Sequence, residues 1–340
     1  MNDPVLETLC LPLTDGTIDL PEDGPALFLR ARTGEALRKL PRDKILCEQS
    51  FKPAYDALVR DGFAVGEGDE TYGLTLVLPP RQREEGRALL VRAIQATQIG
   101  GVVMVAVSNL EGAKTAENDL KRLVGNVTAL SKNKCRVFWA RMDAGRYDAA
   151  QAKAWEDQDE PRPVADGRFV SRPGLFAWDH IDAGSQLLID TLPSGLKGRA
   201  ADLGAGFGYL AHEMLTRYPA VSYIDVIEAE ARALEMARQN LGAFGDRASG
   251  YWLDATGPLP GRYDLIVSNP PFHIDRQDRH DLGQAFIRSA AKALAPGGSF
   301  WMVANRHLPY EETLKAVFRS VETAAQTNAY KVFRAAGVKA

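Results

Sequence analysis

The sequence predicts an α/β protein of two tandem domains, each built around a mostly parallel, seven-stranded sheet that ends in an antiparallel hairpin. The chain has 340 residues, about twice the length of an average domain. Apolar strand patterns alternate with amphipathic helix patterns, which is typical of a parallel sheet covered on both faces. The same landmarks also occur in the same order in both halves of the chain.

The repeated landmarks are a Pro-Pro turn, a helix, a Gly-Gly pair and a final strand. In the first half they are Pro79–Pro80, a helix over 84–97, Gly100–Gly101 and the strand Cys135–Ala140. In the second half they are Pro270–Pro271, a helix over 282–295, Gly297–Gly298 and the strand Tyr330–Ala335. Extra residues follow the second Pro-Pro pair, and functional loops often carry such insertions. We therefore predict domains at residues 1–157 and 168–340, joined by an exposed linker at 158–167.

The remaining elements of the second half follow from apolar periodicity. Strands are expected at Gly198–Leu203, Val221–Ile227, Ala248–Leu253, Tyr263–Ser268 and Ser299–Ala304. Helices are expected at Tyr209–Arg217 and Ala229–Leu241. The last two strands, Ser320–Gln326 and Ala329–Ala335, should form the antiparallel hairpin through a tight turn.

The amino-acid composition excludes an intrinsically disordered protein and a membrane-spanning protein. With 45% hydrophobic and 25% charged residues, the chain has the profile of an average globular protein. No apolar run approaches the roughly 18 residues of a membrane-spanning helix, and the start carries Asp3 and Glu7 where a signal peptide carries basic residues. We therefore expect a cytoplasmic protein that does not contact a membrane.

The cysteines and the net charge bear on three further possibilities: disulfide bonds, a metal site and nucleic-acid binding. Cys10, Cys47 and Cys135 are far apart and lack any Cys-x-x-Cys spacing, so we expect neither disulfides nor a metal site. The net charge is −3, so nucleic-acid binding would have to rest on local basic patches.

A glycine-rich turn follows the first strand of the second half, in Asp202-Leu-Gly-Ala-Gly-Phe-Gly208. Its glycines alternate, which differs from the G-x-G-x-x-G spacing of a dinucleotide site, and no Gly-Lys-Ser/Thr of a P-loop follows. The pattern resembles the first motif of class I S-adenosylmethionine (SAM) dependent methyltransferases, which have a Rossmann-like fold. The resemblance implies SAM as the cofactor, contacted by Asp202, Gly204, Ala205, Gly206 and Gly208.

Two more acidic residues end strands where this family places cofactor contacts. The resemblance implies that Glu228 accepts hydrogen bonds from the ribose hydroxyls and that Asp254 contacts the adenine. SAM carries a sulfonium and an ammonium group, and such charges favour carboxylates over basic side chains. The alternative is that these acids only cap helices and turns.

The fourth strand of the second half ends in Asn269-Pro270-Pro271-Phe272. These residues resemble the Asn-Pro-Pro-Phe/Tyr motif of methyltransferases that act on exocyclic or amide nitrogens. In such enzymes the Asn269 oxygen and the Pro270 carbonyl would accept the two N–H groups, while Phe272 stacks on the base. The prolines stiffen the turn, because proline fixes φ and has no N–H group. His273 could later accept the proton, or it is merely an exposed loop residue.

The stretch Pro173–Leu188 is similar to the segment that precedes the SAM motif in the bacterial 16S rRNA guanine-N2 methyltransferase family. The resemblance covers most of the chain, because the first domain of that family is a degenerate copy of the second. It implies that Phe176, Gly184 and Ser185 wall the cofactor. It also implies ribosomal RNA as the partner, either free or within the 30S subunit or an assembly intermediate. We further expect a monomer.

The first half lacks the residues that would bind the cofactor and the target amine in the second half. Leu29-Arg-Ala-Arg-Thr-Gly34 replaces the glycine-rich turn, and Leu78 replaces Asn269, whereas Glu48 is expected to survive at its strand end. We therefore expect this half to bind neither SAM nor the target amine, and instead to hold RNA or support the fold. The residues expected to bind RNA are Arg81, Arg83, Arg87, Lys132 and Lys134, with Arg276 and Arg279 in the second half.

The leading interpretation is therefore a SAM-dependent rRNA guanine-N2 methyltransferase. A guanine inside an RNA helix would have to be flipped out or presented as a single strand. The motif also fits adenine-N6 or protein glutamine-N5 transfer, and the basic clusters also fit a solvated surface. A non-catalytic RNA-binding assembly factor is the alternative from another class, and intact Asp202 and Asn269 argue against it.

Overall fold

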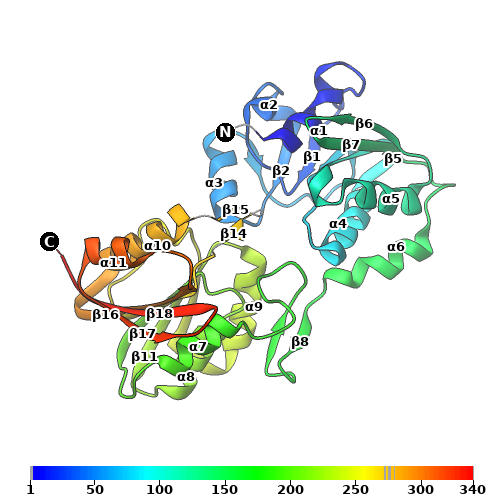
Figure 1. The fold of residues 1–340 in the computed structure, drawn as a ribbon. Coiled ribbons are helices and arrows are strands. Elements are labelled where there is room, and N and C mark those ends of the chain that lie inside the picture. Colours follow the sequence, from blue (N-terminus) through cyan, green and yellow to red (C-terminus); the bar gives the residue numbers. More distant parts are fainter. Residues whose placement is uncertain (1–2, 272, 275–276, 279, 340) are drawn as a thin grey trace. The chain divides into compact units, whose positions relative to one another are not determined.

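The structure, a computed structural model, describes residues 3–271, 273–274, 277–278 and 280–339. The chain divides into two compact units, Met1–Glu160 (unit 1) and Pro161–Ala340 (unit 2). In Figure 1 the colours of unit 1 run from blue to green and those of unit 2 from green to red. Each unit contains a seven-stranded sheet.

Unit 1 alternates strands and helices along the chain. Its strands are β1 (Ala26–Leu29), β2 (Ile45–Glu48), β3 (Ala64–Val65), β4 (Tyr72–Val77), β5 (Thr97–Ser108), β6 (Thr128–Lys132) and β7 (Cys135–Arg141). Its α-helices are α1 (Pro4–Thr14), α2 (Glu35–Arg38), α3 (Lys52–Arg60), α4 (Arg83–Gln95), α5 (Ala113–Val124) and α6 (Ala149–Glu156). Short 3-10 turns are η1 (Arg42–Lys44), η2 (Asn109–Glu111) and η3 (Asp157–Asp159).

Unit 2 follows the same plan after a short hairpin, β8 (Arg162–Val164) and β9 (Phe169–Ser171). The strands of its main sheet are β10 (Gly198–Leu203), β11 (Val221–Glu228), β12 (Ala248–Trp252), β13 (Tyr263–Ser268), β16 (Leu294–Asn305), β17 (Phe318–Gln326) and β18 (Tyr330–Val338). The helices are α7 (Ala183–Thr191), α8 (Tyr209–Arg217), α9 (Ala231–Leu241), α10 (His280–Ala293) and α11 (Glu311–Val317), with a 3-10 turn η4 (Gly242–Arg247). The short strands β14 (His273–Ile274) and β15 (Gln277–Asp278) pair after the Pro-Pro turn.

The two main sheets have the same topology. The strand order is β3-β2-β1-β4-β5-β7-β6 in unit 1 and β12-β11-β10-β13-β16-β18-β17 in unit 2. In each sheet the first five strands pair in parallel, and the last two pair antiparallel. The predicted fold class, an α/β protein with one plan repeated, is confirmed.

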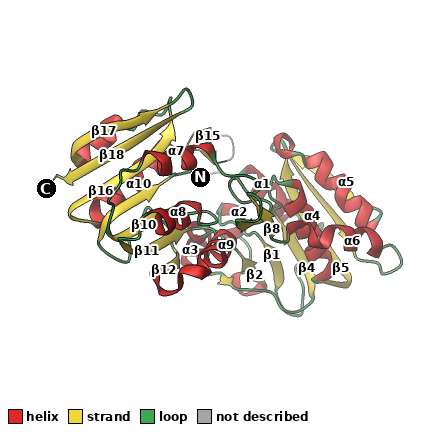
Figure 2. Ribbon diagram, turned by 90° about the horizontal axis from the view of Figure 1, so that it is seen from below, coloured by secondary structure: helices red, strands yellow, loops and turns green. Residues whose placement is uncertain are grey.

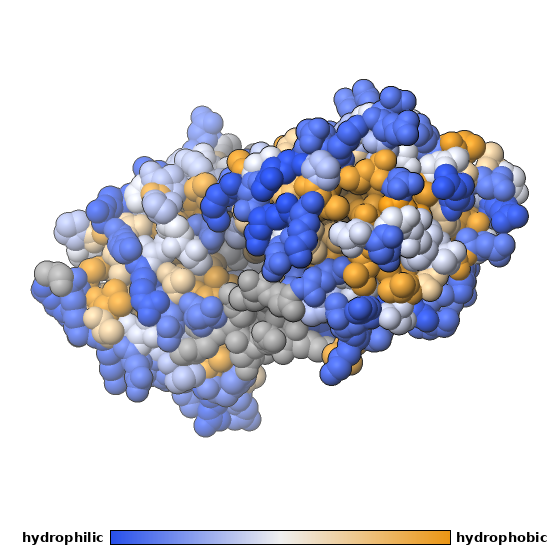
Figure 3. Space-filling view, turned by 90° about the horizontal axis from the view of Figure 1, so that it is seen from above, coloured by the Kyte–Doolittle hydropathy of each residue, from blue (hydrophilic) through white to orange (hydrophobic). Residues whose placement is uncertain are grey.

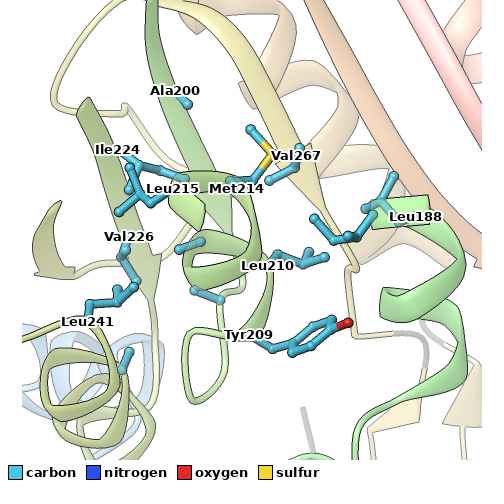
Figure 4. Packing of buried hydrophobic residues seen from close by; sticks show 14 of the residues in the cluster. Leu188, Ala200, Tyr209, Leu210, Met214, Leu215, Ile224, Val226, Leu241 and Val267 are labelled. Carbon is cyan, nitrogen blue, oxygen red and sulfur yellow. The ribbon is translucent and has the colours of Figure 1, made fainter. Parts of the chain in front are cut away.

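Helices cover both faces of each sheet (Figure 2) because every central strand is apolar on both sides. In unit 2, α7, α8 and α9 pack on one face, and α10 and α11 pack on the other. Figure 4 shows Leu188 of α7 and Leu210 of α8 in the first of these cores, beside Val267 of β13. The carboxyl ends of the parallel strands are thus held at one edge of a rigid, two-sided core.

The predicted linker at 158–167 differs from the structure, in which part of this stretch forms the hairpin of β8 and β9. Val164 is buried, and the ring of Phe169 lies 5.6 Å from that of Tyr209 in the core of unit 2. The turn uses positive φ at Ala165, Asp166 and Gly167. The hairpin is too short to produce an apolar alternation, so sequence periodicity could not reveal it.

The described part of the chain has no helix that is long and apolar enough to cross a membrane. On the face in Figure 3, hydrophilic residues predominate and apolar residues lie between them. Large exposed apolar side chains in the described ranges include Ile99, Leu110 and Phe176.

A buried acid on α5, Asp119, pairs with two arginines of α4. Asp119 is 4% exposed, and its carboxylate oxygens lie 3.4 Å from Arg83 and 3.2 Å from Arg87, both on α4. The Arg87 guanidinium also stacks 4.5 Å from the ring centroid of Trp155 on α6. Asp119 and Arg87 therefore connect three helices on one face of the sheet.

Replacing this acid should destabilise unit 1. In Asp119→Ala, the poorly exposed Arg87 loses its counter-charge, so we expect the free energy of unfolding to fall by about 2 kcal/mol. Urea denaturation of the full chain measures the change. The exposed Asp43 provides the control, and Asp43→Ala should stay within about 0.5 kcal/mol of wild type. An equally small change in Asp119→Ala would contradict the assignment.

Candidate functional site

The site lies at the carboxyl ends of β10, β11, β12 and β13, where open parallel sheets bind their ligands. The Ser268 hydroxyl donates a 2.7 Å hydrogen bond to the carbonyl of Leu203 and ties the ends of β13 and β10 together. A Cβ atom built on Gly204 would lie 3.9 Å from Cδ of Pro271. The structure therefore brings the glycine-rich turn and the Asn-Pro-Pro turn side by side.

The glycine-rich turn reverses the chain between β10 and α8. Gly204, Gly206 and Gly208 all have positive φ. At Gly208 a Cβ would lie 3.1 Å from Cα and Cβ of Ala237, so only glycine lets α8 begin this close to α9. The N–H groups of Gly204 and Ala205 donate to the carbonyl of Ile227 and hold the turn against β11.

Asp202 is fully buried at the end of β10. Its Oδ2 accepts a 3.1 Å hydrogen bond from the N–H of Ala211 in α8. Its Oδ1 has no hydrogen-bond partner among the described residues. Burial, with the charge of Glu228 nearby, raises the pKa of Asp202 to about 8. A buried acceptor without a donor is what a ligand that carries a cationic group would satisfy.

Glu228 ends β11 and spans the glycine-rich turn. Its carboxylate accepts hydrogen bonds from the N–H groups of Gly206 at 2.7 Å and Glu230 at 2.8 Å. Burial raises the pKa of Glu228 to about 7, although these two hydrogen bonds oppose the rise. Asp254, just after β12, accepts from the N–H and hydroxyl groups of Thr256. The three acids thus lie at the ends of three neighbouring strands.

Asn269 follows β13 and is anchored through its amide nitrogen. Nδ2 donates to Oδ2 of Asp182 at 2.9 Å and to the hydroxyl of Ser185 at 2.8 Å. Within the described ranges, no hydrogen bond involves the amide oxygen. Pro270 is buried and Pro271 is exposed. The oxygen is therefore available to accept hydrogen bonds at this edge of the sheet.

The segment before β10 contributes the start of α7. Gly184 and Ser185 are buried in its first turn, and Phe176 is 64% exposed. A Cβ on Gly184 would lie 3.0 Å from Cε1 of Tyr330 in β18 and 3.0 Å from Oδ2 of Asp182. The structure thus places Ser185 against Asn269 of the Asn-Pro-Pro turn, and Gly184 against Asp182 and Tyr330.

Asp182 is the residue of this site that the sequence analysis missed. It is the N-cap of α7, and its Oδ2 accepts from the N–H of Ser185 at 2.8 Å. The signal was present, because an aspartate three residues before a serine at a helix start is an N-cap pattern. Nothing in the sequence, however, indicates that the same carboxylate reaches Asn269.

Some predicted site residues cannot be placed. Phe272, Arg276 and Arg279 lie outside the described residues. Of His273 only the backbone, in β14, is described. No group of His, Cys, Asp and Glu in the described ranges has the arrangement of a metal site.

Sheet register defines which residues of unit 1 correspond to this site. Leu29 pairs with Val77 and Glu48, as Leu203 pairs with Ser268 and Ile227. Leu78 therefore stands in the place of Asn269, and it is buried. The lost cofactor positions are Phe28 for Asp202, Arg30 for Gly204 and Arg32 for Gly206.

This register corrects the expectation for Glu48, which corresponds to Ile227 rather than Glu228. Because side chains alternate along a strand, one residue of difference turns Glu48 to the opposite face. There its Oε1 accepts from Arg92 of α4 at 2.7 Å and from the N–H of Gly68 at 2.6 Å. Glu48 is thus not a remnant of the cofactor acid.

The basic residues expected to bind RNA are distributed unequally. Arg83 and Arg87 pair with Asp119, Arg81 lies 3.6 Å from Glu111, and the Arg87 side chain is only 18% exposed. Lys132 and Lys134 are exposed at the turn between β6 and β7. Arg87 is therefore mostly covered and paired within unit 1, whereas the side chains of Lys132 and Lys134 are exposed to solvent.

Comparisons with known proteins identify the family of this chain. Residues 166–334 match the methyltransferase small domain family. The chain is 30% identical to the ribosomal RNA small subunit methyltransferase C proteins of Cronobacter sakazakii and Escherichia coli K12, over 93% of this chain and 90% of each relative. The T. thermophilus 16S rRNA N2 G1207 methyltransferase, solved with AdoMet and guanosine, has the same fold, with a TM-score of 0.81, 23% identity and coverage of 99% of this chain and 92% of that chain. This chain therefore belongs to the ribosomal RNA small subunit methyltransferase C family.

Proposed function

We propose that this protein transfers the methyl group of SAM to the exocyclic N2 of a guanine in 16S ribosomal RNA. The observation that carries the proposal is the anchored Asn269, whose amide oxygen is left as an acceptor beside the glycine-rich turn. The relatives are named for methylation of small-subunit rRNA, and the T. thermophilus protein is described as acting on N2 of G1207.

The residues at the strand ends fit SAM. A bound cation would lower the raised pKa of Asp202, so that its carboxylate would supply the negative charge that the cationic methionine end requires. Glu228 would supply acceptors for the ribose hydroxyls. Asp254 is assigned to the adenine. When bound, SAM supplies an electrophilic methyl group on its sulfonium.

The side chain of Asn269 and the backbone carbonyl of Pro270 would orient the target amine. A guanine amino group is a weak nucleophile because its lone pair is delocalised into the ring. Accepting its two N–H groups at Asn269 Oδ1 and the Pro270 carbonyl aims that lone pair at the methyl carbon, in line with the breaking bond. SAM would supply the methyl group and leave as the neutral thioether, and the methylated nitrogen would release one N–H proton to solvent. Phe272 would stack on the base.

The RNA-binding surface, the form of the substrate, the cellular location and the oligomeric state are also proposals. Unit 1 would hold RNA through Arg81, Arg83, Lys132 and Lys134, or support unit 2, without binding SAM itself. The substrate would be ribosomal RNA in the 30S subunit or in an assembly intermediate, and the protein would act in the cytoplasm as a monomer without a metal ion.

The decisive experiment combines substrate identification with an Asn269 variant. Wild type, labelled SAM and either naked 16S rRNA or 30S subunits should yield N2-methylguanosine in nucleoside digests analysed by mass spectrometry. Asn269→Ala should lower the transfer rate about 100- to 1,000-fold and leave the Kd for SAM within about threefold. Methylation of adenine or of a protein glutamine by wild type would refute the proposed substrate.

The raised pKa of Glu228 predicts a pH-dependent ribose site. The probe 5′-methylthioadenosine has the ribose but neither the sulfonium nor the ammonium of SAM. Hydroxyl donors need the ionised carboxylate, so affinity should be nearly full at pH 8, about half at pH 7 and about tenfold lower at pH 6. Without ligand the sign is opposite: folding raises this pKa from 4.5, so its contribution to stability is lost as the pH rises through about 7. Calorimetry should find a flat affinity profile for Glu228→Gln.

The exposed lysines of unit 1 test the RNA surface. Lys132→Glu with Lys134→Glu should weaken RNA binding and reduce its salt slope by about one per lost phosphate contact, without changing SAM affinity. Lys153→Glu, on the exposed face of α6, is the matched control. RNA affinity that equals the control in filter binding at several salt concentrations would remove this surface from the proposal.

A further inference from the structure

Three polar side chains from two distant segments converge beside the target site. Asp182 and Ser185 belong to the start of α7, and Asn269 follows β13. A single oxygen, Oδ2 of Asp182, accepts hydrogen bonds from the N–H of Ser185 at 2.8 Å and from Asn269 Nδ2 at 2.9 Å. The Ser185 hydroxyl accepts the second N–H of the same amide at 2.8 Å. Both hydrogens of the Asn269 amide are thus occupied.

This arrangement selects one orientation of the amide. An ionised carboxylate only accepts hydrogen bonds, so the group of Asn269 that faces Asp182 has to be NH2 and not the oxygen. The oxygen consequently points away from α7. An amide turned by 180° would present N–H groups to the N–H groups of an incoming amine, and no hydrogen bond between them would form.

Asp182 is itself held in place. It caps α7, and it lies against Gly184, where a Cβ would come within 3.0 Å of its Oδ2. The ring of Tyr330 closes the other side of Gly184, where the same Cβ would come within 3.0 Å of its Cε1. A side chain fixed by a cap and by close packing can hold its neighbour in one orientation.

We propose that Asp182, assisted by Ser185, is the positioning residue that orients the Asn269 amide so that its oxygen faces the target amino group. The negative charge on the NH2 side also shifts electron density toward the amide oxygen, which accepts more strongly as the target N–H groups become acidic during transfer. This inference rests on the proposed function, because Asn269 acts only if the target is an amine.

The first test separates the amide contact from the helix cap. Serine is a good N-cap but is too short to reach Asn269, so Asp182→Ser retains the cap and loses the contact. We expect the single-turnover methylation rate to fall at least tenfold, with the Kd for SAM within about threefold of wild type. The matched control is Asp148→Ser at the N-cap of α6, where Asp148 accepts from the N–H of Gln151. The control should keep the wild-type rate.

The second test exchanges the two partners. Asn269→Asp alone places two carboxylates in contact and should reduce the rate at least 100-fold. In Asp182→Asn with Asn269→Asp, the new NH2 group takes the position of Oδ2 and donates to the new carboxylate, whose other oxygen faces the amine. The cap hydrogen bond from the N–H of Ser185 to that position is lost. We expect the double variant to be at least tenfold faster than Asn269→Asp. A merely structural role of Asp182 would not produce such a recovery.

The outcomes of these experiments distinguish the positioning role of Asp182 from the identity of the substrate. A wild-type rate in Asp182→Ser, or a double variant no faster than Asn269→Asp, overturns the positioning role. Methylation of a different nitrogen by wild type refutes the guanine substrate, whereas the same rate ratios, measured on that nitrogen, still decide whether Asp182 orients the amide.

Discussion

The site depends on the parallel pairing of β10 with β11 on one side and with β13 on the other. Because parallel strands end at the same edge, this pairing brings residues far apart in the chain to adjacent strand ends. Leu203 ends the central strand and pairs with Ile227 on one side and Ser268 on the other. These two residues immediately precede Glu228 and Asn269. A slip of one residue in either pairing would turn the side chains of that strand to the wrong face.

Unit 1 shows that this scaffold persists without its chemistry. Its strands follow the same order, and Arg30 has a φ of 53° where Gly204 has 71°. The backbone path of the turn is therefore retained even though an arginine occupies a conformation that favours glycine. Phe28 and Leu78, which replace the buried acid and the asparagine, are fully or nearly fully buried apolar residues. Apolar packing has replaced the polar groups that a ligand would satisfy.

The sequence predicted the parts of the fold that leave a periodic or a motif signal. The alternation of apolar residues gave strand Gly198–Leu203 and helix Tyr209–Arg217 with the observed bounds. Comparing the motifs of the two halves matched Glu48 with Glu228 instead of Ile227, because sheet register cannot be read from a motif. The sequence pattern missed the β8–β9 hairpin, whose strands are too short to produce an apolar alternation. It also missed the contact of Asp182 with Asn269, since residues so distant in sequence meet only after folding. The placement of Phe272 and the RNA-binding roles remain predictions.

The unpartnered Oδ1 of Asp202 has a consequence for the lifetime of the protein. A buried carboxyl group with an unsatisfied oxygen makes the cofactor-free state costly, and any ligand that satisfies it adds its binding free energy to the stability of the fold. The cofactor-free protein would therefore unfold more readily than the cofactor-bound protein. When SAM is scarce, a larger fraction of molecules would open far enough for cellular proteases to degrade them.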